Sequence, residues 1–199
     1  MQKREERQRM ITDCLSSHIE QMFFARSRDT MEYFYKNKES VLHRLLSALA
    51  LASEPAKSLI SSGKKRKIRM LQFSFLLSGA LMNERKLRMD FYDERYFGDI
   101  TEAGGYWDYS VLFPYIDEDI ESLKGILSKQ MLRVKEYELI DLRMVYHVGV
   151  FAIMEEVLTK LAAEDGFTKA FTEIYEPKVS VMYGAYLDQS KLIATVLGR

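Results

Sequence analysis

The sequence predicts an all-α protein: a single-domain antiparallel bundle of about five to seven helices that spans residues 1–199. Apolar residues recur at the spacing of helical turns along most of the 199-residue chain. Glycine and proline, which mark the turns between strands, occur only ten and three times. Apolar residues make up 47% of the chain and charged residues 29%, a balance that supports a packed core and excludes global disorder.

Two amphipathic helices are predicted at the N-terminal end, near 5–34 and near 40–61. Each carries a continuous apolar stripe at helical spacing, and Gly63 follows the second helix as a stop signal. A third helix is predicted near 66–96. It contains the longest charge-free stretch, fourteen residues from Met70 to Asn83, and is therefore expected to be the most buried helix.

A long helical pattern covers residues 117–163, and one of its ends is marked by acidic residues that complement a helix dipole. An unbroken helix of this length would extend about 70 Å. We therefore expect one long, interrupted helix, with the interruption between Val134 and Leu139. A last helix is predicted near 178–197, directly after Pro177, because proline is tolerated in a first helical turn.

Helical periodicity weakens in an aromatic and acidic connecting segment, residues 90–116, which we expect to be extended, with a short strand or a single turn. Residues 90–121 hold ten acidic residues and one basic residue, a net charge of −9. Tyrosine and tryptophan are favoured at protein interfaces. The segment therefore predicts an interaction surface made of five aromatic residues: Tyr92, Tyr96, Tyr106, Trp107 and Tyr109. Alternatively, these rings cover an open end of the bundle.

Motifs for catalysis and for cofactors are missing from the sequence. It contains no glycine-rich phosphate loop and no G-x-S-x-G nucleophile motif. Cys14 and His18 are one turn apart, but both fall on an apolar stripe and are expected in the core. The three histidines form no metal-binding motif. We therefore expect no cofactor and no metal site, and no reaction can be assigned.

The sequence favours a non-enzymatic helical interaction module, such as an adaptor, a chaperone-like protein or a regulatory protein. The alternative is a sensor of a small apolar ligand, because methionine and aromatic side chains inside a helical bundle can line an adaptable cavity. The residues expected to line that cavity are Phe75, Met144, His147 and Phe151.

The stretch from Tyr33 to Glu39, followed by Val41 and Leu42, resembles the end of the DNA-reading helix in TetR-type repressors. The resemblance covers seven to ten residues. It implies a third function, a degenerate TetR-like regulator. Those repressors have a three-helix headpiece of about 45 residues with a glycine-bearing turn. Here 32 residues precede Tyr33, and none of them is glycine.

A homodimer is expected, since the helical stripes exceed what a small bundle covers and residues 54–88 carry a net charge of +7 that complements residues 90–121. Nucleic acid is not expected as a partner, because the chain has no net charge and the basic run 64–67 fits a solvated loop. No membrane-spanning segment is expected. The single cysteine and the absence of a signal-like start predict a cytoplasmic protein.

Overall fold

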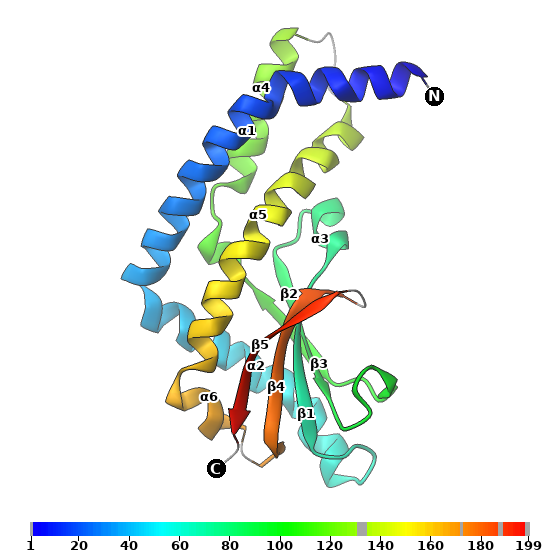
Figure 1. Ribbon diagram of the computed structural model, residues 1–199, viewed down its shortest axis with the longest axis vertical. Coiled ribbons are helices and arrows are strands. Elements are labelled where there is room, and N and C mark those ends of the chain that lie inside the picture. The colour runs from blue at the N-terminus through cyan, green and yellow to red at the C-terminus, as the bar shows by residue number, and fades with distance from the viewer. Residues whose placement is uncertain (1, 131–134, 172, 187–188, 198–199) are drawn as a thin grey trace.

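The computed structural model describes residues 2–130, 135–171, 173–186 and 189–197 (Figure 1). The side chains of some helical residues, Met144 and His147 among them, lie outside this description. The chain forms a five-stranded mixed sheet with helices packed against it, which is an α/β fold. The prediction of an all-α helical bundle is therefore wrong.

The two N-terminal helices are close to their predicted positions. Helix α1 extends over Gln2–Lys36, and α2 follows over Lys38–Ser61. The N-terminal part of α1 projects from the rest of the molecule (Figure 1). The segment that resembles a TetR-type reading helix lies where α1 meets α2. Residues 2–36 form one helix, so no three-helix headpiece precedes it.

The long helical pattern is divided into α4 (Ile116–Gln130) and α5 (Glu136–Ala162), and a short helix α6 (Asp165–Ala170) follows. The predicted interruption falls partly on residues 131–134, which lie outside the described residues. Helix α5 begins where the Glu138 carboxylate accepts the backbone N–H of Lys135 at 2.7 Å. The same carboxylate pairs with Arg7 of α1, which ties the start of α5 to the first helix.

The third predicted helix is wrong. Its residues form strand β1 (Ile68–Phe75), the short helix α3 (Leu77–Met82) and strand β2 (Lys86–Tyr92). Both faces of β1 are buried except at Arg69, although Gln72 and Ser74 alternate with Leu71, Phe73 and Phe75 along it. This alternation is only five residues long and lies inside the charge-free stretch from Met70 to Asn83, which favoured a buried helix.

The last predicted helix is also wrong, because residues 178–197 lie in strands β4 (Tyr175–Ala185) and β5 (Ser190–Leu197). Val179, Val181 and Tyr183 alternate along β4 and are buried. Their period of two and their β-branched or aromatic side chains are typical of a strand. The connecting segment contains β3 (Gly104–Asp108) between two short 3₁₀ helices, η1 (Tyr96–Gly98) and η2 (Ser110–Leu112).

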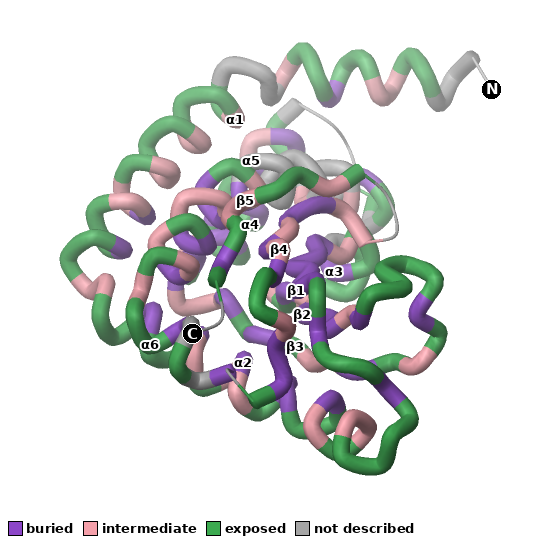
Figure 2. Tube along the Cα trace, turned by 60° about the horizontal axis from the view of Figure 1, so that its bottom comes forward, coloured by how far each residue is buried: buried purple, intermediate pink, exposed green. Residues whose placement is uncertain are grey.

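The strand order is β3-β2-β1-β4-β5, in which β1 and β4 are parallel and the other neighbours are antiparallel. Helices α2 and α5 cover the same face of the sheet. Gly105 of β3 approaches Ala52 of α2 so closely that a Cβ at Gly105 would be 2.8 Å from the Ala52 Cβ. On the same face, Phe75 of β1 contacts Phe151 of α5, with ring centroids 6.3 Å apart. The buried residues of Figure 2 are concentrated in the strands and where helices face them.

Within the described ranges, no helix is both long enough and apolar enough to cross a membrane. In the same part of the chain, no group of three or more His, Cys, Asp or Glu side chains converges as a metal site would require.

Candidate functional site

The two faces of the sheet differ in character. The face that contacts the helices is apolar, with Leu87, Met89 and Phe91 of β2 all buried. The alternate residues of β2 and its neighbours point to the other side, which we call the open face. The open face carries these polar and aromatic residues: Gln72, Ser74, Arg88, Asp90, Tyr92 and Tyr106.

An ion pair lies across the centre of the open face. The Nε of Arg88 donates to both carboxylate oxygens of Asp90, at 2.9 and 2.8 Å, and the Arg88 guanidinium stacks on Tyr186 at 4.4 Å from the ring centroid. Burial raises the pKa of Asp90, because an apolar environment disfavours a charged carboxylate. Arg88 opposes this effect, and its own pKa is raised by the hydrogen bond to Asp90.

On the neighbouring strand β1, two buried polar side chains, Gln72 and Ser74, lie opposite Asp90 and Arg88. In the described residues, Gln72 Oε1 and Ser74 Oγ have no hydrogen-bond partner, although the Gln72 amide nitrogen donates to the Phe73 carbonyl at 3.0 Å. Tyr92, opposite Met70 in the register, packs edge-on against Phe97, with ring centroids 5.5 Å apart. Burial raises the pKa of Tyr92 to about 12, so the phenol stays protonated at neutral pH.

The connection between β2 and β3, residues 93–103, is fixed by a buried cluster of charges. Lys65 pairs with Asp99 and also donates to the Thr101 carbonyl at 2.7 Å. Arg95 binds Asp93 at 2.6 Å and Asp99 at 3.0 Å. Because several of these bonds involve charged groups on one short segment, they hold it in a single conformation.

One edge of the sheet is the outer side of β3. Tyr109 donates its N–H to the Arg85 carbonyl, and Phe91 donates its N–H to the Ala103 carbonyl. Directly opposed residues of an antiparallel pair alternate between hydrogen-bonded and non-hydrogen-bonded pairs. Between Ala103 and Tyr109, this alternation makes Gly105 and Trp107 the residues whose backbone groups hydrogen-bond to β2. The backbone groups of Gly104, Tyr106 and Asp108 therefore point away from the sheet.

A groove follows this edge and offers about 260 Å³ of space to water. On the open face it is bounded by the Arg88–Asp90 pair, by exposed Tyr106 and by Glu102; Pro55 of α2 lines it as well. The glycines at 104 and 105 are required by close approach within the protein, since a Cβ at Gly104 would clash with the Met89 carbonyl oxygen and one at Gly105 with Ala52. The groove lies beside the outward-facing backbone groups of Gly104 and Tyr106.

The structure separates the five aromatic residues of the predicted interaction surface. Tyr106 is exposed on β3 beside the groove, and Tyr96 is exposed on η1. Tyr92 is half-buried on the open face. Trp107 and Tyr109 are buried in the core against the helices.

The residues of the predicted ligand cavity are only partly described, since the side chains of Met144 and His147 lie outside the description. Phe75 and Phe151 come together, with ring centroids 6.3 Å apart. The Phe151 ring stacks on Tyr183 with centroids 4.5 Å apart, and the Tyr183 hydroxyl donates to the Phe151 carbonyl at 3.1 Å.

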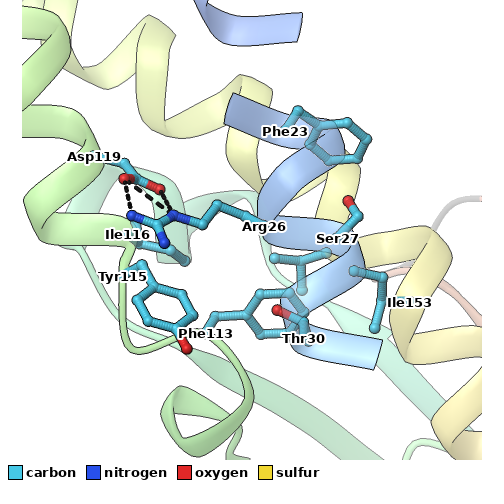
Figure 3. Close-up of a pocket in the computed structure, with 10 residues that line it drawn as sticks. Phe23, Arg26, Ser27, Thr30, Phe113, Tyr115, Ile116, Asp119 and Ile153 are labelled. Atoms are coloured by element: carbon cyan, nitrogen blue, oxygen red, sulfur yellow. Dashed lines mark hydrogen bonds and ion pairs between the residues drawn. The ribbon is translucent and has the colours of Figure 1, made fainter. Parts of the chain in front are cut away.

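A second hollow lies between α1, α4 and α5 (Figure 3). Arg26 binds the buried Asp119 carboxylate through two nitrogens and stacks on Tyr115 at 4.3 Å from the ring centroid. Phe23 and Ile153 face the same space. The hollow leaves about 20 Å³ for the centre of a water molecule, which is room for a single water. It is therefore a seam between helices, not a ligand pocket.

Sequence reasoning found the aromatic segment but missed the strand edge within it. The signal was the Gly104–Gly105 pair followed by Tyr106 and Trp107, which combines residues for close approach with residues of high strand propensity. Arg88 and Asp90 gave no signal, because they were assigned to a helix.

Comparison with known proteins found no family model, no curated protein and no solved structure that matches this chain.

Proposed function

We propose that the protein is a non-enzymatic interaction module that binds an extended segment of a protein partner along the edge of β3. The observation that carries this proposal is the outward direction of the Gly104 and Tyr106 backbone groups, which open into the groove. An extended peptide can satisfy these groups by adding a sixth strand to the sheet, and the main-chain hydrogen bonds then provide affinity.

The surroundings of the edge support this mode of binding. The buried side chains of Lys65, Asp93 and Asp99, together with the exposed Arg95, hold the segment before β3, so little ordering is required when a partner binds. Tyr106 offers an exposed ring beside the edge, which is 52% accessible to solvent. Tyrosine provides a large contact area with few rotatable bonds.

Substitution of Tyr106 by proline tests the proposal. The N–H of Tyr106 points away from β2, so proline removes an outward donor without removing a bond inside the sheet. Tyr106→Ala is the matched control, because it removes the ring and keeps the donor. Linear peptides selected from a random displayed library against the natural protein serve as probes.

The selected peptides are expected to bind Tyr106→Ala with reduced affinity and to lose binding to Tyr106→Pro, while both variants keep a cooperative unfolding transition. The peptides should also slow hydrogen exchange at the Gly104 and Tyr106 amides. Equal binding to natural protein and to Tyr106→Pro would exclude strand addition at this edge. Failure of the library to yield any binder would also contradict the proposal.

A further inference from the structure

The chemistry of the partner segment can be read from the side chains along the β3 edge; this step depends on the proposed function. Gly104, Tyr106 and Asp108 alternate along β3 and share the open face, and Glu102, which precedes the strand, pairs with Arg88 on that face at 4.0 Å. Glu102 and Asp108 are both exposed and are six positions apart, a distance of about 20 Å along an extended chain. An acidic group thus lies on each side of Gly104 and Tyr106, and Glu102 also lines the groove.

The charge around this part of the open face is negative. It contains the carboxylates of Glu84, Asp90, Glu102 and Asp108 and, among the described residues, the cations Lys86 and Arg88. Arg88 is bound to Asp90 and also lies 4.0 Å from Glu102, and Lys86 binds Glu84 at 3.2 Å although it lies opposite Asp108 in the register. These six groups sum to a net charge of −2, and the Glu102 and Asp108 side chains face solvent.

We infer that the partner is a basic extended segment that pairs antiparallel with β3, with four of its side chains on the open face. The first and seventh residues are Lys or Arg, opposite Asp108 and Glu102. The third is aromatic or β-branched and packs on Tyr106, because such cross-strand pairs stabilise antiparallel sheets. The fifth is large and lies opposite Gly104, where β3 itself offers no side chain.

A second copy of the chain does not meet this requirement. If two β3 strands paired antiparallel about Tyr106, Asp108 of one copy would lie diagonally to Glu102 of the other. Diagonal neighbours in a sheet are about 7–8 Å apart, and like charges at such positions are unfavourable. The negative edge therefore selects a basic partner over self-association.

Two synthetic peptides of identical composition test the inference by fluorescence anisotropy. The first has Lys at its first and seventh positions, Tyr at the third, Leu at the fifth and Thr elsewhere. The second has its lysines at the second and sixth positions, where an extended chain turns them to the opposite face. The first peptide is expected to bind at least tenfold more tightly, and salt should reduce the difference.

The variant Glu102→Lys/Asp108→Lys should lose this preference and should bind a peptide with Glu at the first and seventh positions. If both lysine peptides bind equally and Tyr106→Pro still abolishes binding, the inferred side-chain pattern is wrong and the strand-addition function stands. If neither peptide binds, the pattern is equally excluded, and the library-selected peptides decide the proposed function separately.

Discussion

Lys65 and Asp99 form an ion pair in which both side chains are completely shielded from solvent. The pair joins the loop before β1 to the loop before β3, two segments 34 residues apart in the chain. Asp99 also accepts the backbone N–H groups of Asp93 and Thr101, at 3.2 and 3.0 Å. Through these bonds the Asp99 carboxylate holds together the segment before β3, at one end of the proposed groove.

Removal of one partner should destabilise the fold strongly. Lys65→Met leaves the buried Asp99 charge with only Arg95 as a counterion, and breaking a buried pair in this way costs about 3 kcal/mol or more. Chemical denaturation measures the loss in the free energy of unfolding. Lys64→Met is the control, because Lys64 is exposed and its substitution should change stability by less than about 0.5 kcal/mol. Equal stability of the two variants would contradict the role assigned to Lys65.

Asp93 should make stability depend on pH in the acid range. The hydrogen bonds from Arg95 lower the pKa of Asp93 to about 2, whereas a carboxyl in an unfolded chain has a pKa of about 3.9. A lowered pKa stabilises the folded state above pH 4, and this contribution, on the order of 2 kcal/mol, is lost as the pH falls from 4 to 2. Urea unfolding of Asp93→Asn between these values should show a flatter pH dependence than the natural protein. The control is Glu94→Gln, which changes an exposed carboxylate and should keep the pH dependence of the natural protein.

Two buried serines should respond oppositely to alanine. Ser74 Oγ has no partner in the described residues, so Ser74→Ala removes an unsatisfied group and is expected to leave stability unchanged or to raise it by about 1 kcal/mol. Ser53 is equally buried, but its hydroxyl donates to the Ala50 carbonyl at 2.7 Å. Ser53→Ala is therefore expected to be the less stable variant in thermal unfolding. A large loss at Ser74 would show that its hydroxyl has a partner in solution.

The helices at the N-terminal end could be predicted because each is long, has apolar residues at helical spacing and contains no glycine. The sheet could not, because its central strand β1 is buried on both faces. Its apolar residues Leu71, Phe73 and Phe75 alternate with Gln72 and Ser74, but over only five residues inside a longer charge-free stretch that is typical of a buried helix. The scarcity of glycine and proline favoured the same helical interpretation, since few of the strand connections use them as turn residues.

The aromatic segment was recognised as unusual, yet its residues could not be sorted by composition alone. Once β3 is known to be a strand, alternation separates Tyr106 on the open face from Trp107 in the core. The outward direction of the Tyr106 backbone depends on the register with β2, which is a tertiary property. The segment that contains the proposed edge could thus be singled out by its composition, and the strand edge within it could not.

Alanine substitutions at two glycines test how tightly α2 packs against β3. A Cβ at Gly105 would lie 2.8 Å from the Cβ and 3.2 Å from the Cα of Ala52, so Gly105→Ala must push α2 away from β3. Overpacking of this kind costs about 1–3 kcal/mol. Gly125 in α4 has no atom within 4 Å of the corresponding position, and Gly125→Ala should instead stabilise the protein by up to about 1 kcal/mol, because alanine favours a helix.

Ala52→Gly combined with Gly105→Ala should recover part of the loss, since the clash requires both methyl groups. Denaturation of the natural protein, of the single variants Ala52→Gly and Gly105→Ala and of the double variant measures this coupling, and a coupling of zero would mean that α2 and β3 are not in contact at this position.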